Sequence, residues 1–407
     1  MRLARPHPRR FWPMACLLGS LAALPWACLA QSSYVLTTLK SPNSRPVRPA
    51  VIDEQNRVVG TAEYYAGIGL SNTGLFGLGA TYDAFSVRWP AGTTSSVSPV
   101  KLFGTQGGGV RAVSSNGSKV TLDIGAAWVK DVDSGATVTD LIPGAMRLSS
   151  DPARSVQPGS FGQVADNGSV LLNFTQSNPA DDTPRAAFWT TNTDGRELPF
   201  SGYAGAQSLA LRGNDIVGGL VIEPESAFER AALWRQGVLT VIDSVPGRAS
   251  AAALVNASGQ AVLRLQPRTG SQGGYWASYG APTYVMHTHG SDTPIAALQP
   301  SDSIWPRALN NAGVVVGRMG PATPAGYPFY WGKPGLPVNN EGSTGRAFIW
   351  RQGVTTDLNT WVSARGVRLP SGSVLVDARS INDQGSIVAQ MRSSTGTLSW
   401  VRLTAQP

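Results

Sequence analysis

The sequence predicts an all-β fold, a seven-bladed β-propeller of four-stranded antiparallel blades. A hairpin motif recurs seven times along the chain at an average period of about 55 residues. A second apolar segment, usually centred on tryptophan, follows each copy. Only 14% of the residues are charged, which is low for a helical protein with ion pairs on its surface and typical of a β protein rich in Gly, Ser and Thr.

Residues 1–30 have the pattern of a secretory signal peptide. Arginines open the chain, an apolar stretch runs from Phe11 to Leu29, and small residues end it at Ala30. We expect cleavage before Gln31. A membrane anchor is the alternative, but prolines and a glycine interrupt the apolar stretch. Residues 31–407 are then predicted to form a single propeller domain.

Both cysteines, Cys16 and Cys28, lie in this first segment, so the mature chain is expected to contain no disulfide. A lipoprotein anchored at Cys28 is an alternative that Pro25 and Trp26 disfavour. Removal of the segment leaves a net charge of about +4, without a run of Lys or Arg, which disfavours nucleic acid as a partner. No later stretch has the roughly 18 apolar residues of a membrane span. We therefore expect a soluble mature protein.

Each copy of the repeat is predicted to be a β-hairpin. An apolar residue enters, a short turn reverses the chain at a Gly or Asn able to adopt positive φ, and Val or Ile residues leave in an extended strand. The predicted turn positions are Asn56, Gly117, Gly168, Asn214, Gly259, Gly313 and Gly385.

The tryptophan segments are predicted to be the third strand of each blade, and in most copies a fourth strand follows, as in residues 137–141 and 354–358. In the fifth copy the third strand is expected near Gly274. The last copy ends after the Trp400 strand, whereas residues 34–39 resemble an isolated fourth strand. We therefore expect residues 34–39 to pair with residues 397–403 and complete the last blade. Separate sheets without a closed ring are the alternative.

The repeat resembles that of secreted bacterial proteins with HAF-type extracellular repeats. The best copy is LNNAGVVVG at Leu309–Gly317, followed by RAFIWRQGVTTDL at Arg346–Leu358. The resemblance spans nearly the whole mature chain, although most copies lack the histidine that the family has before Ala-Phe. It implies export and a β-propeller-like fold, and it carries no catalytic residues to this chain.

Long connections between second and third strands are predicted to form the ligand face. They carry aromatic residues that suit stacking on sugar rings or contact with a partner protein, with strand and core roles for the same aromatics as the alternative. The aromatic candidates are Tyr64, Tyr65, Tyr327, Tyr330 and Trp331. Arginines just before three third strands would add a cationic arc for carboxylated ligands, or would simply lie with their charged ends in solvent. They are Arg185, Arg230 and Arg346.

Catalytic groups are few. His287 and His289 are the histidines that remain after signal removal, and on a strand both would face the same side. We expect them on the outermost strand of the fifth blade without a fixed carboxylate partner, which favours a surface role without chemistry. We find no GxSxG, HExxH or phosphate-binding glycine loop, so no catalytic residue, metal or cofactor is predicted.

The sequence thus favours an exported, monomeric, non-enzymatic propeller that is periplasmic or secreted and binds a glycan or a protein partner. A propeller-type polysaccharide lyase or hydrolase acting on an acidic glycan is one alternative. Such an enzyme would use His287 or His289 with a tyrosine and an arginine that neutralises a uronate carboxylate. A purely structural scaffold is the other alternative.

Overall fold

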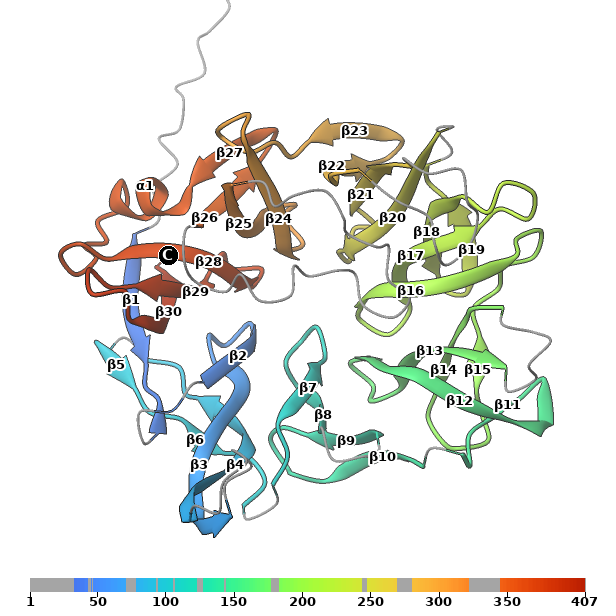
Figure 1. Ribbon diagram of the computed structural model, residues 1–407, viewed down its shortest axis with the longest axis horizontal. Coiled ribbons are helices and arrows are strands. Elements are labelled where there is room, and N and C mark those ends of the chain that lie inside the picture. The colour runs from blue at the N-terminus through green and yellow to red at the C-terminus, as the bar shows by residue number, and fades with distance from the viewer. Residues whose placement is uncertain are drawn as a thin grey trace, which may run out of the picture.

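A computed structural model describes residues 33–42, 45, 47–70, 78–92, 94–104, 107–122, 127–142, 144–176, 183–243, 247–268, 280–321 and 345–406. These residues form an all-β structure with almost no helix, as the sequence predicts. The strands assemble into mostly antiparallel sheets that lie around a common axis (Figure 1). None of the helices in these ranges is long and apolar enough to cross a membrane.

We number the sheets in chain order and give the strands of each in the order in which neighbours pair. Sheet 1 contains β2 (Val47–Ile52), β3 (Val58–Leu70), β4 (Leu78–Trp89) and β6 (Val100–Lys101). Sheet 2 contains β10 (Thr137–Leu141), β9 (Ala127–Asp131), β8 (Lys119–Leu122) and β7 (Val110–Val113). Sheet 3 contains β11 (Arg147–Leu148), β12 (Asp151–Val164), β13 (Val170–Gln176), β14 (Arg185–Trp189) and β15 (Arg196–Glu197).

The second half of the chain repeats this plan. Sheet 4 contains β16 (Gly205–Arg212), β17 (Ile216–Ile222), β18 (Glu229–Arg235) and β19 (Val238–Val241). Sheet 5 contains β20 (Arg248–Val255), β21 (Ala261–Pro267), β22 (Thr283–Thr288) and β23 (Ser291–Pro294). Sheet 6 contains β24 (Asp302–Leu309), β25 (Val315–Pro321), β26 (Arg346–Arg351) and β27 (Val354–Asp357). Sheet 7 contains β28 (Val374–Ile381), β29 (Ile387–Arg392), β30 (Leu398–Ala405), β1 (Tyr34–Leu39) and β5 (Ser96–Val97).

The two parts of β12 have different partners. Its first residues pair irregularly with β11, whereas the residues from Val156 onward pair with β13. The described residues therefore contain seven sheets if β11 is counted with β13–β15, and eight if β11 and the start of β12 are counted separately.

The recurring motif forms a hairpin in each sheet. The residue that reverses the chain has positive φ at six of the seven predicted positions, where glycine or asparagine avoids most of the strain that other residues would suffer. These residues are Asn56, Gly117, Gly168, Gly259, Gly313 and Gly385. In sheet 4 the positive φ falls on Gly213 and not on the predicted Asn214.

Buried asparagines connect three of these turns to the neighbouring sheet. The Asn256 Nδ2 donates to the main-chain oxygen of Asn310 at 3.0 Å, and the Asn310 Nδ2 donates to that of Asn382, also at 3.0 Å. The Asn382 Nδ2 donates to the main-chain oxygen of Asp53 at 2.8 Å. Each Oδ1 accepts from the main-chain N–H four residues later, which closes its own turn. The motif therefore encodes the hairpin and also a contact between sheets.

The tryptophan of the third strand packs between sheets. Trp89, Trp189, Trp234 and Trp350 are buried. Each indole Nε1–H donates to a main-chain oxygen of the segment that arrives from the preceding sheet, at 3.0, 3.1, 2.7 and 3.1 Å in that order. A large apolar ring with one hydrogen bond suits this position, and this explains the recurrence of tryptophan in the sequence.

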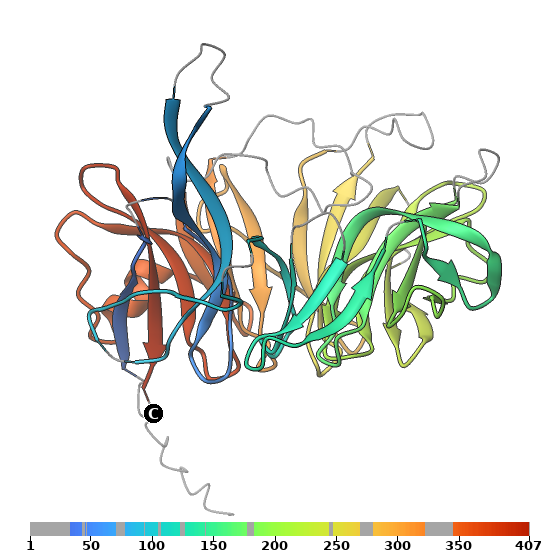
Figure 2. The ribbon, with the colours of Figure 1, turned by 90° about the horizontal axis from the view of Figure 1, so that it is seen from below.

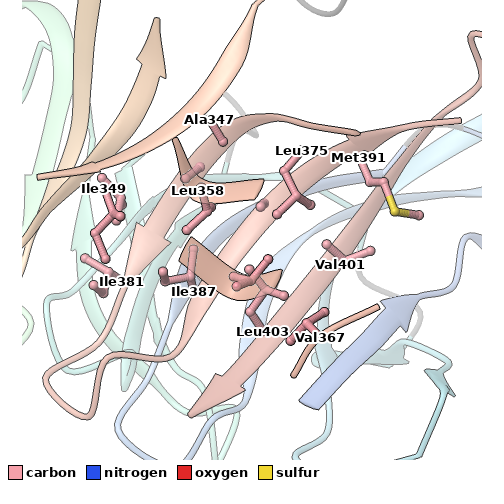
Figure 3. Packing of buried hydrophobic residues seen from close by; sticks show 14 residues of the cluster. Ala347, Ile349, Leu358, Val367, Leu375, Ile381, Ile387, Met391, Val401 and Leu403 are labelled. Carbon is pink, nitrogen blue, oxygen red and sulfur yellow. The ribbon is translucent and has the colours of Figure 1, made fainter. Parts of the chain in front are cut away.

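Aliphatic side chains from neighbouring sheets form the core. Figure 3 shows the cluster between sheets 6 and 7, where Ala347 and Ile349 of β26 pack against Leu375 of β28 and Leu403 of β30. A similar cluster joins sheet 7 to sheet 1, since Val388 of β29 packs with residues of β2, β3 and β4.

The N-terminal strand completes the last sheet. β1 pairs with β30 over its whole length, from Tyr34 opposite Ala405 to Leu39 opposite Trp400, which confirms the predicted pairing. The buried Arg402 of β30 donates to the main-chain oxygens of Asn56, Pro90 and Gly92 in sheet 1, at 2.7, 2.8 and 2.6 Å.

Two further local predictions differ from the structure. The third strand of sheet 5 is β22, which begins at Thr283, because this segment and not the one at Gly274 pairs with β21. The segment at Gly274 lies outside the described residues. In sheet 6 the fourth strand ends at Asp357, and the helix α1 (Leu358–Ser363) follows, because the Asp357 carboxylate caps it by accepting from the Asn359 N–H.

Candidate functional site

The hairpin of β3 and β4 carries two predicted ligand-binding residues, Tyr64 and Tyr65. Its pairing with β2 ends at Ala62, and its pairing with β6 involves only Val87 and Arg88. The far part of the hairpin extends beyond the other sheets, as Figure 2 shows. A two-stranded ribbon without a sheet on either side has little support of its own, so its side chains must stabilise it.

The aromatic rings of the hairpin form two pairs on opposite faces. Tyr65 lies opposite Tyr82 in the register, and their ring centroids are 6.0 Å apart in an edge-to-face arrangement. Tyr64 packs edge-to-face on Phe85 at 5.6 Å, and burial raises the pKa of the Tyr64 phenol. Tyr65 is 53% exposed, so the Tyr65–Tyr82 face is the one open to a partner.

A cation lies over each aromatic pair. The Arg45 guanidinium is 4.2 Å from the Tyr82 ring centroid and forms an ion pair with Glu63 at 3.4 Å. The Lys101 ammonium is 3.6 Å from the Phe85 centroid. These contacts help to hold the two strands of the ribbon together.

Arg185, at the start of β14, lines an open cavity of about 490 Å³. Its Nη1 is 2.9 Å from the Glu197 Oε1, and its guanidinium is 5.4 Å from the Phe200 ring centroid. Tyr203 and Pro199 add apolar surface to the same wall. The cavity therefore combines ring faces with a guanidinium, a carboxylate and the hydroxyls of Ser149, Ser150 and Ser201.

Arg230 is buried at the corresponding point of sheet 4. Its Nε lies 2.7 Å from the Glu223 Oε1, and its Nη1 donates to the Arg248 main-chain oxygen at 3.1 Å. The hydrogen bond from Arg230 lowers the pKa of the Glu223 carboxyl. These contacts assign Arg230 a structural role at the start of its strand.

Arg346 begins β26 in sheet 6 with a half-exposed side chain, 3.5 Å from the Asp357 carboxylate. The three predicted arginines thus occupy equivalent places at the start of third strands, and each has a carboxylate from its own sheet as a partner. An anionic ligand would compete with that carboxylate at each position. The remaining predicted contacts, Tyr327, Tyr330 and Trp331, lie outside the described residues.

A second cavity of about 250 Å³ lies where the hairpins of all the sheets meet, and the sequence analysis missed it. The apolar residues that open the repeat line its wall, among them Ile52, Val255 and Leu309. The sequence therefore did contain a pattern that indicates this cavity, because one residue from each repeat faces a shared axis. At its polar end the Arg212 Nη2 lies 3.2 Å from the Asp383 Oδ2, and burial raises the pKa of Glu54.

The strand position of His287 and its carboxylate partner both differ from what the sequence predicts. It lies on β22, the third strand of sheet 5 and not the outermost, and its Nδ1 is 2.8 Å from the Asp292 Oδ1 of β23. His289 lies in the turn with positive φ, so the two histidines do not share one strand face. No group of three or more His, Cys, Asp and Glu side chains in the described ranges is arranged to hold a metal ion.

No protein-family model matches the chain, and no curated protein matches it. Among solved structures, the chain is similar to a candidate TolB from Agrobacterium tumefaciens, at 11% identity and a TM-score of 0.37, over 72% of this chain and 88% of the other. A mannose phosphorylase from Leishmania mexicana, solved with a phosphate ion, follows at 12% identity and a TM-score of 0.22, over 62% and 88%.

A third similar structure is PorZ, a surface component of the type-IX secretion system of Porphyromonas gingivalis. It has 10% identity and a TM-score of 0.16, and the match covers 88% of this chain and 63% of PorZ. These similarities are too distant to carry an activity or a partner to this chain.

Proposed function

We propose that this protein is an exported, non-enzymatic β-propeller of seven blades that binds a glycan in the cavity at Arg185. The seven-bladed ring is supported by the pairing of β1 with β30, by the hydrophobic cluster between sheets 7 and 1, and by the contacts of Arg402. Export is supported by the signal pattern in residues 1–30. The repeat pattern supports membership of the HAF-type repeat family.

The observation that carries the glycan proposal is the composition of the Arg185 cavity. A sugar ring has an apolar face and a rim of hydroxyls, so it suits a site with aromatic or proline faces beside groups that donate and accept hydrogen bonds. Phe200, Tyr203 and Pro199 supply the first kind of surface. The guanidinium of Arg185 and the carboxylate of Glu197 supply the second.

Glycan arrays with the purified protein test this proposal. Saturable binding of a glycan is expected, and Tyr203→Ala should weaken it about tenfold through the loss of a ring face. Arg346→Ala is the matched control, because this exposed arginine does not line the cavity and its change should leave affinity unaltered. Binding that tolerates Tyr203→Ala and Arg185→Ala alike would refute the site.

The β3–β4 hairpin supports a second candidate function, the binding of a protein partner. The exposed Tyr65 and its neighbour Tyr82 form an aromatic surface on an element that extends beyond the sheets. Pull-down of a partner that is lost with Tyr65→Ser and retained with Tyr203→Ala would assign it to the hairpin. Loss with Tyr203→Ala alone would assign it to the cavity.

The enzyme hypothesis stays a prediction, with the His287–Asp292 pair as the observation that favours it. Incubation with uronate-containing polysaccharides should produce new ultraviolet absorbance if the protein is a lyase. Activity that survives replacement of both histidines by alanine would exclude them as the base.

A further inference from the structure

The second cavity lies at the common axis of the sheets, and we call it the axial cavity. Each of sheets 1 to 7 contributes at least one residue to its lining, from Ile52 of sheet 1 to Ile381 of sheet 7. Its volume of about 250 Å³ is several times the roughly 30 Å³ that one water molecule occupies in the liquid. The cavity is thus large enough for a small organic molecule, which would touch strands from the whole chain.

Irregular pairing turns extra side chains toward the axial cavity. The register of β16 on β17 shifts between Ser208 and Ala210, which leaves Leu209 without a residue opposite it in β17. The register of β20 on β21 shifts in the same way at Ala253. Both Leu209 and Ala253 line the cavity. Because a β-bulge redirects a side chain and bulges are frequent next to active sites, these shifts favour a cavity that is shaped for a ligand.

Most residues that line the axial cavity are aliphatic. Among them are residues that directly precede a hairpin turn, such as Ile52, Val255, Leu309 and Ile381. Aliphatic side chains gain from contact with a hydrocarbon group, whereas a sugar ring is better matched by the aromatic faces of the Arg185 cavity. The wall of the axial cavity therefore suits the hydrocarbon part of a small ligand.

The end of the cavity at the hairpin turns carries more carboxylates than cations. Glu54 lines the cavity, and its carboxylate oxygens accept from the Asp383 N–H at 3.0 and 3.1 Å. Arg212 also lines it, and its Nη2 lies 3.2 Å from the Asp383 carboxylate. The Oγ of Ser115, a third lining residue, donates to the Asp166 carboxylate at 3.0 Å. Three carboxylates thus accompany one guanidinium, so a cation is the complementary ligand charge.

Glu54 is the carboxylate best placed to meet that cation. It forms no ion pair in the described ranges, because the Arg212 guanidinium, which acts on its charge from farther away, pairs with Asp383. Burial raises the pKa of Glu54, and the hydrogen bond from the Asp383 N–H offsets this only in part. The ionised carboxylate is therefore short of stabilising partners, and an ammonium group beside it would supply one.

We infer that the axial cavity binds a small organic amine, whose hydrocarbon part lies against the aliphatic wall and whose ammonium group meets the Glu54 carboxylate. A charge-assisted hydrogen bond to Glu54 would fix the orientation of the amine. Contact with all seven sheets would let the ligand stabilise the whole arrangement of sheets. The axial cavity shares no lining residue with the Arg185 cavity, so this inference does not depend on the glycan proposal.

Isothermal titration of the purified protein with hexylammonium and benzylammonium tests the inference, with hexanoate and benzoate as anions of similar size. Saturable binding of at least one amine is expected, with an increase in the unfolding temperature as the amine is added. Neither anion should bind saturably. The inference is overturned if neither amine binds saturably at millimolar concentration, or if the anions bind as tightly as the amines.

Glu54→Gln should weaken amine binding about tenfold, because the amide keeps an acceptor for the Asp383 N–H but loses the charge. Glu225→Gln is the matched control and should bind as the unchanged protein does, because Glu225 is exposed in the β17–β18 connection, at the other end of sheet 4. Arg212→Gln should tighten amine binding, because it leaves the Asp383 carboxylate without its guanidinium. Unaltered affinity of Glu54→Gln, or weaker binding by Arg212→Gln, would overturn the inference.

Ala253→Leu keeps the test decisive if Glu54→Gln does not fold, because it fills part of the axial cavity and leaves every carboxylate in place. It should weaken amine binding about tenfold or more. Tyr203→Ala, which alters the Arg185 cavity, should bind the amines as the unchanged protein does, so failure of the glycan proposal and failure of this inference are distinguishable. Amine binding that Ala253→Leu leaves unaltered would place the ligand elsewhere and overturn the inference.

Discussion

Asn256, Asn310 and Asn382 each combine two functions in one small side chain. The oxygen closes the turn in which the residue lies, and the amide nitrogen bonds to the next sheet. Ser114 and Ala165 occupy the equivalent position in sheets 2 and 3, where neither side chain has an amide to donate in this way. The turns of sheets 2 and 3 are linked to the next sheet by other residues, since Asp166 accepts from the Asn116 N–H and the Asn214 Oδ1 accepts from the Asn167 N–H.

Asn310→Ala is expected to lower the free energy of unfolding by about 2 to 3 kcal/mol. The change removes the hydrogen bond from the partly buried Val314 N–H and the buried hydrogen bond to the Asn382 oxygen. Urea unfolding followed by tryptophan fluorescence measures the loss. Ser258→Ala, in the exposed part of the neighbouring turn, should cost less than about 0.5 kcal/mol. Equal effects of the two changes would contradict this role of Asn310.

Asp131 is predicted to make stability depend on pH. Hydrogen bonding from the Lys119 ammonium, and then from Ser134, lowers the pKa of the Asp131 carboxyl in the folded protein. A lowered folded-state pKa means that the carboxylate stabilises the protein above its unfolded-state pKa, near 4, and loses this contribution as the pH falls.

Asp131→Asn should therefore lower the free energy of unfolding by about 2 kcal/mol at pH 7 and by clearly less at pH 3. Denaturant titrations of both proteins at the two pH values provide the comparison. A difference that is the same at pH 3 and pH 7 would show that the ionised carboxylate is not the source.

Individual turns and strands could be predicted where residues close together in the sequence determine them. The hairpin turns follow from Gly and Asn at fixed places, and positive φ at Gly313 and Gly385 agrees with this. Strand β22 was misplaced because the Gly274 segment has the aromatic composition of a third strand, whereas pairing with β21 selected Thr283–Thr288. The His289-Gly290 turn, in which both residues have positive φ, was the local signal that would have corrected it.

The candidate sites were less predictable than the strands. Arg185 was identified from its place before a third strand, but its cavity depends on Phe200 and Tyr203 in the connection to the next sheet. Tyr34 and Trp361 pack against the same core cluster across more than 300 residues of sequence. Residues so distant along the chain come together only because β1 lies beside β30, which no local sequence pattern indicates.

For strand β1 we predict that loss of a main-chain N–H and loss of a side-chain hydroxyl have different effects on stability. The Thr38 N–H donates to the oxygen of Ser95, just before β5, at 2.9 Å, and the Lys40 N–H donates to the oxygen of Val97 in β5 at 2.8 Å. The alternate N–H of Thr37 therefore faces β30. Thr37→Pro should therefore remove a bond to β30 and cost about 3 kcal/mol or more.

Thr37→Val is the matched control, because it keeps the N–H and removes a buried hydroxyl that has no hydrogen-bond partner. It should leave stability unchanged or increase it by up to about 1 kcal/mol. Thermal and urea unfolding of the two variants give the comparison. A mild Thr37→Pro effect would show that β1 contributes little to the last sheet.

The whole molecule depends on contacts between sequence-distant sheets. Each sheet has apolar side chains that its neighbour covers, so the low content of charged residues follows from sheets that bury one another. The contact between sheets 7 and 1 has additional polar support, because Arg402 and Asn382 both reach residues of sheet 1. Loss of this contact would expose apolar side chains of both sheets to water.

Native-state hydrogen exchange in β1 and β29 tests the closure of the ring most directly. If β1 is an integral strand of the last sheet, the amides of Thr37 and Leu39 should exchange with the same free energy of opening as those in the middle of β29. Exchange of the β1 amides at the rate of a frayed terminus, while β29 stays protected, would contradict the closed ring.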